Sequence, residues 1–461
     1  MPVTLPEGLM VSVSGIRGQV GSPLTPELVA AVAAYFGDFL KREGSGDHIC
    51  VGRDSRTSGP MFEAAVVAGL QSVGCRVTTL GIVPTPTLLL AVEHHGAAGG
   101  VCVTASHNPA EWNALKLVSS EGMFLDADLA ARFQAFLAES EAGRAPWDGL
   151  GTVASDPGAV DRHLNRILEL PQLDRRELKK KGIRVALDCV RGAGGVMVPE
   201  LLERLGCHVA AMDTEPDGRF PRDPEPTARN LRALGQLVRG SGADVGLALD
   251  PDADRLSLVD ERGEPLGEDL TLALAADVVL RRTPGPVVTN LSTSQVVEDV
   301  ARAHGAPCHR APVGEVNVAR RMQSEAAVVG GEGNGGVILP EVHWTRDAPV
   351  GAALVLQYLV DVEEPLSVAV GRLPSYAIVK EKLAFPREAL EEAYQTLEED
   401  MAAEERDRTD GLRLAWPRKG AWLHVRPSGT EPVVRLIAEA RDQAAAKELV
   451  QRAGGVLEGV L

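Results

Sequence analysis

Three carboxylates stand at alternate positions in the segment Asp250-Pro-Asp-Ala-Asp-Arg, directly after the apolar run 245–249. In a loop, this spacing can turn three oxygen ligands onto one hard cation, which is the arrangement that Mg²⁺ or Ca²⁺ requires. Acidic groups this close repel one another unless a cation or an arginine lies between them. An EF-hand is a poor match, because the sixth position of such a loop needs glycine and here holds Arg255. The sequence therefore predicts a different kind of cation site at Asp250, Asp252 and Asp254.

A serine hydroxyl lies on a small-residue turn in the segment Thr104-Ala-Ser-His-Asn-Pro. Ser106 is followed by the imidazole of His107, but no G-x-S-x-G elbow surrounds it, which argues against an acyl-transfer hydrolase. A serine hydroxyl can instead carry a phosphoryl group where a metal or basic groups neutralise the charge. Lys116, ten residues further on, can supply part of that charge.

Two further loops carry groups suited to a sugar phosphate. The glycine-rich run 330–336 is expected to be a flexible loop whose polar side chains are Glu332 and Asn334. The segment Arg426-Pro-Ser-Gly-Thr-Glu-Pro offers a guanidinium fork, two hydroxyls and backbone amides, which suit a phosphate dianion. The basic clusters 14–18 and 52–56 are weaker signals. Each of these loops, taken alone, also fits an ordinary turn.

The elements that position these loops form a repeated unit of strand, turn, helix and strand. The unit begins at 48–52, again at 185–188 and again at 287–290, and each copy ends in one of the first three loops described above. We therefore expect three related α/β domains with mixed sheets, followed by a smaller C-terminal α+β domain. Ligands gather at the carboxyl ends of strands in such sheets, so the loops should meet around a central cleft. The expected domains are 1–150, 151–255, 256–370 and 371–461, with a helix over 386–405 in the last.

Composition narrows the class of protein. The chain of 461 residues has a net charge of −17, which argues against general nucleic-acid binding and requires any phosphorylated ligand to sit in a local positive pocket. No apolar stretch is long enough to span a membrane, and no secretory signal is visible. The six cysteines form no C-x-x-C pair, as expected for free thiols in a reducing cytoplasm.

Jointly and in this order, the loops resemble those of the α-D-phosphohexomutase superfamily, which comprises phosphoglucomutases, phosphomannomutases and phosphoglucosamine mutases. The resemblance covers nearly the whole chain and includes the segment Ser14-Gly-Ile-Arg-Gly. It implies that Ser106 is a phosphoserine that, with Asp250, Asp252 and Asp254, holds one Mg²⁺. The implied lining of the reacting phosphate is Arg17, His107, Lys116 and Arg255, with Arg17 and Lys116 as candidates for acid–base help. The implied sugar ligands are Glu332 and Asn334, and the implied grip on the second phosphate is Arg426, Ser428, Gly429 and Thr430.

The implied reaction interconverts a hexose 6-phosphate and a hexose 1-phosphate through a 1,6-bisphosphate, with glucose or hexose 1,6-bisphosphate as activator. By the same resemblance, the first domain carries the phosphoserine, and the second, third and fourth domains bind the metal, the sugar and the phosphate, in that order. Small-molecule sugar phosphates are the expected partners, and the oligomeric state, monomer or dimer, stays open. The sugar loop and the phosphate loop look most like those of phosphoglucosamine mutases, so glucosamine 6-phosphate and glucosamine 1-phosphate are the first choice. Mannose and glucose phosphates are close alternatives.

This sequence departs from the family pattern at one point of possible mechanistic weight. Many relatives end the sugar loop with Ser-Gly-His, whereas Gly336 stands here in place of the histidine that is often credited with acid–base help. His343 is a nearby residue that could compensate. The metal loop also has Pro251 and Ala253, and the serine domain has Ala114, where glycines are common.

Two hypotheses from other classes stay open. A D-x-D metal-dependent phosphatase would release phosphate from sugar phosphates without isomerisation, although that pattern favours Thr or Val where Asp254 stands. A non-catalytic sugar-phosphate sensor would bind hexose phosphates and be indifferent to Ser106→Ala. The presence of Ser106, the aspartates and Lys116 argues against the sensor, since binding alone has little need of a phosphorylatable serine.

Overall fold

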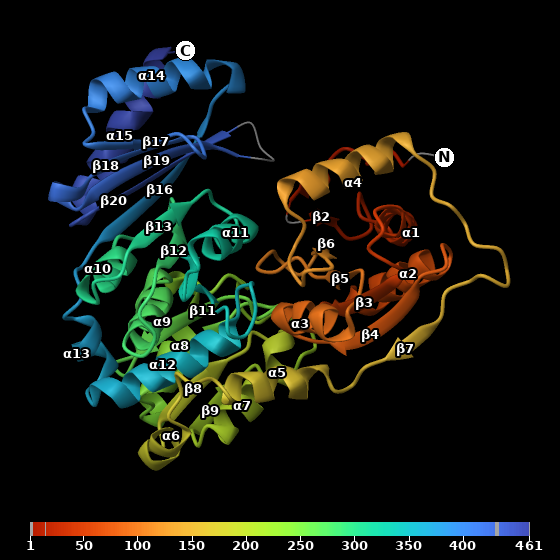
Figure 1. Ribbon diagram of the computed structural model, residues 1–461. Helices are drawn as coiled ribbons and strands as arrows, with labels where there is room; N and C mark the ends of the chain where they lie inside the picture. Colours follow the sequence, from red (N-terminus) through yellow and green to blue (C-terminus); the bar gives the residue numbers. More distant parts are fainter. Residues whose placement is uncertain (1–2, 14, 429–432, 461) are drawn as a thin grey trace.

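The chain folds into three α/β domains and a smaller C-terminal domain, as a computed structural model that describes residues 3–13, 15–428 and 433–460. Figure 1 shows the N-terminal domain at the right, the second and third domains at the lower left, and the C-terminal domain above the third. The predicted fold class is confirmed. The domain boundaries near residues 150, 255 and 370 stay predictions.

The first domain is built on a seven-stranded mixed sheet with the order β1-β2-β6-β5-β3-β4-β7. Its central strands are apolar and fully buried, and helices cover both faces. The strands are β1 (Met10–Ser12), β2 (Gly15–Gln19), β3 (His48–Arg53), β4 (Arg76–Ile82), β5 (Gly99–Val103), β6 (Trp112–Ser119) and β7 (Val153–Ser155). The helices are α1 (Pro26–Arg42), α2 (Gly59–Gln71), α3 (Thr85–His95) and α4 (Ala127–Glu139).

The second and third domains repeat the core of this sheet with four strands each. Their orders are β11-β10-β8-β9 and β13-β12-β14-β15. The second domain contains α5 (Ala159–Leu168), α6 (Arg175–Lys181), β8 (Arg184–Asp188), α7 (Val198–Arg204), β9 (His208–Met212), α8 (Arg232–Ser241), β10 (Val245–Leu249) and β11 (Leu256–Asp260). The third contains α9 (Asp269–Leu280), β12 (Val287–Asn290), α10 (Val296–Ala303), β13 (Cys308–Ala311), α11 (Glu315–Glu325), β14 (Val329–Glu332), β15 (Gly336–Ile338), α12 (Ala348–Val362) and α13 (Leu366–Val370).

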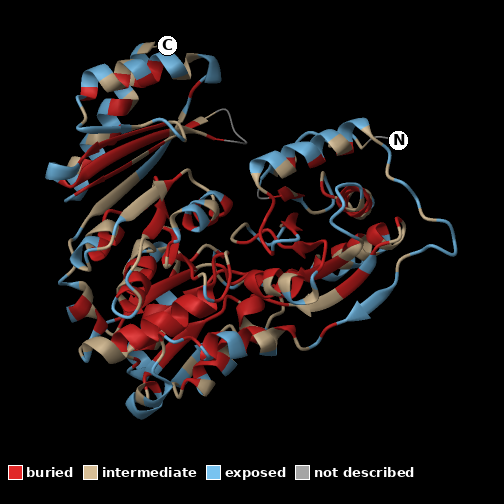
Figure 2. Cartoon of the chain, viewed as in Figure 1, coloured by how far each residue is buried: buried red, intermediate tan, exposed pale blue. Residues whose placement is uncertain are grey.

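The second and third domains share one hydrophobic core. Helices α9 and α12 are apolar on nearly all sides, as expected for helices that are covered by protein all round, and the core that contains them continues into α7 and β8 of the second domain. Figure 2 shows this region as the largest continuous block of buried chain. A separate cluster packs Leu88 and Leu89 of α3 against Met322 and Ile338, which joins the first domain to the third. None of the described helices is long and apolar enough to cross a bilayer.

The C-terminal domain is an antiparallel five-stranded sheet with the order β16-β20-β19-β18-β17, and it has a core of its own. Its elements are β16 (Ala377–Ala384), α14 (Leu390–Met401), β17 (Glu405–Asp407), β18 (Leu412–Trp416), β19 (Ala421–Pro427), β20 (Val433–Ala440) and α15 (Gln443–Val460). The helix predicted over 386–405 ends earlier, at Met401, because Ala402 adopts a left-handed backbone with φ 43°. The residues that follow form β17 at the sheet edge.

The three loops that carry the predicted chemistry occupy the same topological place in the three related sheets. Each loop joins a parallel strand to an antiparallel neighbour: β5 to β6, β10 to β11 and β14 to β15. We name them the serine loop (104–111), the metal loop (250–255) and the sugar loop (332–335), which begins at Glu332, the last residue of β14. The sugar loop is shorter than the glycine-rich run suggested, because Gly330 and Gly331 pair within β14 and Gly336 begins β15.

Candidate active site

The serine loop places Ser106 against the metal loop. The Ser106 hydroxyl donates a hydrogen bond of 2.7 Å to Asp250 Oδ2, and it lies 3.4 Å from His107 Nδ1. Ser106 is 3 % exposed and has a left-handed backbone, with φ 48°, which is uncommon for a residue with a side chain. The predicted nucleophile and the predicted metal site are therefore in direct contact.

A buried ion pair fixes the backbone of this loop. The Arg56 guanidinium is fully buried and donates to the carbonyl oxygens of Ser106, Asn108, Pro109 and Trp112 at 2.5–2.9 Å. Its Nε pairs with Asp54 Oδ2 at 3.0 Å, and the same carboxylate oxygen accepts a bond of 2.6 Å from Thr104 Oγ1. Four carbonyls in and next to this curled loop thus receive a charged donor inside the protein.

Each aspartate of the metal loop has at least one oxygen held by the protein. Asp250 Oδ1 accepts the backbone N–H groups of Asp254 and Arg255. Asp252 Oδ2 accepts from Thr85 Oγ1 and from Lys116 Nζ, both at 2.8 Å. The ligand oxygens of the three side chains lie within 4.8 Å of one another.

The remaining oxygens of this cluster fit a divalent cation. Asp252 Oδ1 and Asp254 Oδ1 are buried and accept no hydrogen bond within the described chain, although a buried carboxylate oxygen normally does. Oxygens of this kind, held in place by partners on their other side, are the ligands that Mg²⁺ prefers. The residues present therefore fit the predicted Mg²⁺ site, which the Ser106 oxygen could complete.

The charges of the cluster shift its pKa values in opposite directions. Burial, together with Asp254 and Asp252, raises the pKa of Asp250 well above its ordinary value. Burial also acts to raise the pKa of Asp252, but the Lys116 ammonium outweighs it and leaves this pKa below its usual range. The same pairing with Asp252 and Asp254 overcomes burial at Lys116, whose pKa is raised. Lys116 is thus held as a cation beside the loop.

Cations surround His107, the residue next to the serine. Arg255, burial and Arg17 lower the pKa of His107 well below its usual value, so the ring is neutral at neutral pH. Burial and the neighbouring Arg255 likewise lower the pKa of Arg17, whose guanidinium donates to Asn108 Oδ1. A histidine that cannot be protonated marks a positive environment. Such surroundings suit a phosphoryl group in this otherwise acidic protein.

The sugar loop lies against the metal loop. Leu256 donates its backbone N–H to the Gly335 carbonyl at 3.0 Å, and a Cβ at position 335, where φ is 84°, would meet the Leu256 oxygen at 2.4 Å. Glu332 is 3 % exposed, and its Oε1 accepts from Asn290 Nδ2 and from the backbone N–H of Gly314. Its Oε2 accepts from Arg346 and, at 3.3 Å, from Asn334 Nδ2. Four donors therefore orient this carboxylate.

The predicted phosphate loop belongs to the C-terminal sheet. Arg426 pairs with Asp410, Nε to Oδ2, at 3.1 Å, and the Ser428 carbonyl accepts from Arg387. Gly429 and Thr430 lie outside the described residues, as does Ser14. The sheet is tied to the third domain, because Glu439 accepts from the backbone of Gln295, and His424 bonds to Ser292 Oγ at 2.8 Å. The structure thus brings the first three loops together and leaves Arg426 and Ser428 on a separate element.

Sequence reasoning missed three residues that organise the site, namely Thr85, Arg56 and Arg346. Thr85 begins α3 and holds Asp252, and Arg56 belongs to the basic cluster 52–56, which was only a weak signal in the sequence. Arg346 donates to both Asp254 and Glu332. The one available signal was position, since Arg56 follows the strand adjacent to β5. His343 belongs to a different buried cluster, in which it bonds to Asp347.

A buried serine hydroxyl beside three carboxylates that fit a cation, with basic residues close by, is the arrangement expected of a phosphoryl-transfer enzyme on an α/β fold. The comparisons agree with this class. The chain matches all four parts of the family described as phosphoglucomutase/phosphomannomutase: alpha/beta/alpha domain I over 9–143, domain II over 161–263, domain III over 267–376 and the C-terminal domain over 377–453. The chain belongs to this family, the phosphohexomutases, which are isomerases.

Relatives that are 36 % and 37 % identical to this chain carry different names within the family. A probable phosphoglucosamine mutase of Methanopyrus kandleri is 37 % identical over 96 % of this chain and 96 % of its own length. A phosphoglucomutase/phosphomannomutase of Thermococcus kodakarensis is 36 % identical over 98 % of this chain and 99 % of its own. A solved phosphoglucomutase/phosphomannomutase family protein from Burkholderia thailandensis superposes with a TM-score of 0.83 at 26 % identity, with 98 % of each chain covered.

Proposed function

We propose that the protein interconverts glucosamine 6-phosphate and glucosamine 1-phosphate, with a phosphorylated Ser106 and a bound 1,6-bisphosphate as intermediates. The observation that carries this proposal is the 2.7 Å contact between Ser106 Oγ and Asp250, at a carboxylate cluster that fits a cation. A hydroxyl in that place can hold a phosphoryl group between the cation and the guanidinium groups of Arg17 and Arg255.

The proposed reaction consists of two phosphoryl transfers in opposite directions, each of a different phosphoryl group. In the first transfer the bond from phosphorus to Ser106 Oγ breaks, a bond to the free hydroxyl of the hexose monophosphate forms, and the proton of that hydroxyl replaces phosphorus on Ser106. The bisphosphate then turns around, and its other phosphoryl group returns to Ser106 by the reverse exchange. Bound Mg²⁺ supplies charge neutralisation at the phosphoryl oxygens.

The roles of the chain's own residues follow from their charge. Lys116, which is held as a cation by Asp252, is suited to give a proton to the leaving serine oxygen. Arg17 and Arg255 neutralise the phosphoryl group, and the neutral His107 can share a hydrogen bond with it. Glu332 and Asn334 are assigned to the sugar hydroxyls. Arg426, Ser428, Gly429 and Thr430 are assigned to the phosphate that does not react, which is the fixed end of the turning intermediate.

Two of the relatives described above bear on the choice of sugar. The Methanopyrus kandleri relative is named a probable phosphoglucosamine mutase and is similar over nearly its whole length, which favours glucosamine phosphates. The Thermococcus kodakarensis relative carries the name phosphoglucomutase/phosphomannomutase at nearly the same identity, which keeps glucose and mannose phosphates as the second choice. Relative kcat/KM values on a panel of hexose 1-phosphates decide between them.

One experiment tests the mechanism. The purified protein is incubated with Mg²⁺ and glucose 1,6-bisphosphate, phosphorylation is mapped by peptide mass, and mutase turnover is measured with and without the bisphosphate activator. We expect phosphate on Ser106 and loss of turnover in Ser106→Ala. Ser119→Ala is the matched control, because Ser119 is also buried and the one described hydrogen bond of its hydroxyl goes to the Met123 carbonyl, away from the metal loop.

The other outcomes identify the alternatives. Phosphate release without isomerisation would indicate a D-x-D phosphatase. Binding of hexose phosphates without turnover, unchanged in Ser106→Ala, would indicate a sensor. Full mutase turnover in Ser106→Ala would refute the phosphoserine mechanism.

A further inference from the structure

Arg346 lies where the metal loop and the sugar loop meet, in the segment between β15 and α12. It is 8 % exposed and faces three carboxylates. Its Nη2 donates to Asp254 Oδ2 at 2.5 Å and its Nη1 to Glu332 Oε2 at 2.8 Å. Its Nε pairs with Glu315 Oε2 at 3.1 Å. One guanidinium thus bonds directly to a predicted metal ligand and to a predicted sugar ligand.

Within the described chain, no other side chain donates hydrogen bonds to acidic groups of both loops. Asp254 Oδ2 is held by Arg346, which leaves Oδ1, the oxygen that accepts no hydrogen bond, for a cation. Glu332 Oε2 is held by the same guanidinium. Because an arginine offers separate N–H groups in a rigid fork, it can orient both carboxylates at once.

Gly336 is what admits the Arg346 side chain. A Cβ built at position 336 would lie 2.2 Å from Arg346 Cδ and 2.7 Å from its Cγ, far inside van der Waals contact. The space that a side chain at 336 would fill is therefore occupied by the arginine stem. Any residue larger than glycine there must displace Arg346 from its two carboxylates.

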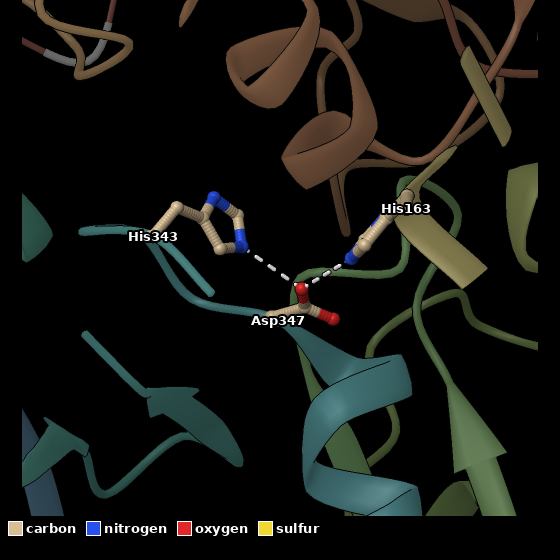
Figure 3. Close-up of side chains that lie close together, drawn as sticks. All are labelled: His163, His343 and Asp347. Atoms are coloured by element: carbon tan, nitrogen blue, oxygen red, sulfur yellow. Dashed lines mark hydrogen bonds and ion pairs between the residues drawn. The ribbon is translucent and has the colours of Figure 1, made fainter. Parts of the chain in front are cut away.

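The backbone beside Arg346 is anchored independently of the site. Figure 3 shows Asp347 between His163 and His343, whose Nε2 atoms lie 2.7 and 2.9 Å from its Oδ2. The other oxygen of Asp347 caps α12 by accepting from the Val350 backbone N–H, and His163 also bonds to Thr87 of α3. These fully buried contacts join elements of three domains next to Arg346, so its guanidinium has a fixed base.

We propose that Arg346, admitted by Gly336, is a positioning residue that links the metal loop to the sugar loop, so that cation affinity and sugar affinity depend on each other. This inference rests on the proposed function for the identity of the two ligands. When Glu332 holds the guanidinium less tightly, the guanidinium competes more strongly with the cation for Asp254. When Glu332 holds it more tightly, this competition is weaker. By linkage, a cation at Asp254 alters the hold on Glu332 to the same degree.

A double-mutant cycle read by cation binding tests the link. Mn²⁺, a paramagnetic substitute for Mg²⁺, is titrated by electron paramagnetic resonance into Glu332→Gln, Arg346→Met and the double variant. We expect Glu332→Gln to weaken Mn²⁺ binding by roughly 5-fold in the presence of Arg346, and by less than about 2-fold in its absence. Equal shifts in both backgrounds would overturn the proposal.

A second cycle tests the shared space. Gly336→Ala is expected to lower the Tm by roughly 2–8 °C with Arg346 present and by less than about 1 °C in the Arg346→Ala background, which lacks the Cγ and Cδ atoms that the new Cβ would meet. Gly335→Ala is the control, because its Cβ meets backbone and its φ is positive, so it should destabilise both backgrounds equally. Equal losses for Gly336→Ala in both would refute the role of Gly336.

Two features keep these tests decisive. If Arg346→Met does not fold, Arg346→Lys takes its place in the cation-binding cycle, because a single ammonium keeps the charge but cannot give separate donors to both carboxylates. The expected and refuting results of that cycle are then the same. Neither readout needs turnover, so failure of the link is distinguishable from failure of the phosphoserine mechanism, which Ser106→Ala tests by activity.

Discussion

Two substitutions of Arg56 distinguish the effect of its charge, which stabilises the serine loop, from the effect of its shape, which positions the Ser106 hydroxyl. Arg56→Met removes the partner of Asp54 and the donors to the backbone carbonyls of the loop, all inside the protein. Arg56→Lys keeps a positive charge for Asp54, but its single nitrogen cannot reach carbonyls on two sides of the loop. The two variants therefore predict different combinations of stability and activity.

The size of the effect follows from burial. Arg56 and Asp54 are both 0 % exposed, and breaking a buried pair by removing one partner costs about 3–5 kcal/mol. Loss of the carbonyl contacts adds to this only where water cannot replace them, so we expect Arg56→Met to destabilise the first domain by about 3–5 kcal/mol. A displacement of Ser106 by about 1 Å is enough to lower kcat roughly 100-fold. We expect that loss in both variants, with most of the stability retained in Arg56→Lys.

The assay needs a local and a global readout, because a four-domain chain need not unfold in one step. Hydrogen exchange of the peptide 104–112 reports the loop, scanning calorimetry reports the first domain, and mutase kinetics give kcat. Arg53→Lys is the matched control, since Arg53 lies in the same segment and pairs with Glu63 away from the serine loop. Wild-type kcat in Arg56→Lys would refute the geometric argument. Wild-type stability in Arg56→Met would refute the argument from the buried charge.

Three further predictions concern the metal loop, acid stability and the cation beside the serine. Thr85→Val removes a donor of 2.8 Å to Asp252 with little change in shape, so Mn²⁺ affinity measured by titration should fall roughly 10-fold; Thr78→Val, which removes a part-buried bond to His48 away from the site, should leave it unchanged. Burial lowers the pKa of His424 to about 4, so between about pH 6.5 and pH 4 the unfolded chain binds more protons than the folded chain, and the folded state loses stability as the pH is lowered. His424→Gln should remove up to about 3 kcal/mol of that loss. An unchanged slope of Tm against pH in this variant would contradict the prediction. Lys116→Met leaves Asp252 without its cation and should lower kcat by at least roughly 100-fold with KM changed by less than about 3-fold; a change confined to KM would contradict its place at the reacting group.

The loops were predictable because each carries its chemistry in a contiguous segment. Asp250, Asp252 and Asp254 lie within five residues, and the hydroxyl of Ser106 follows a recognisable apolar strand. The repeated order of strands and helices then fixed their common place in three sheets. Local sequence was sufficient wherever local residues form the feature.

The supporting residues were not predictable, because their partners are distant in the chain. Arg346 meets Asp254 across 92 residues, and Thr85 meets Asp252 across 167. The segment Thr345-Arg346-Asp347 has the polarity of an exposed loop, yet all three side chains are buried. Proximity in sequence also misled at His343, which is close to Gly336 along the chain but bonds to Asp347. Only tertiary packing decides which charged residues are inside.

The curled conformation of the serine loop decides which donors can phosphorylate the folded protein. Protein kinases act on segments that can be drawn out into an extended strand, whereas Ser106 has a left-handed backbone, is 3 % exposed and lies in a loop bound by Arg56. Drawing this loop out would break the buried bonds that hold it. A small sugar bisphosphate needs no such change, since it enters the site as a ligand. If Ser106 carries the phosphoryl group, the enzyme is therefore charged from within its own reaction, and its activity follows the supply of bisphosphate instead of a signalling cascade.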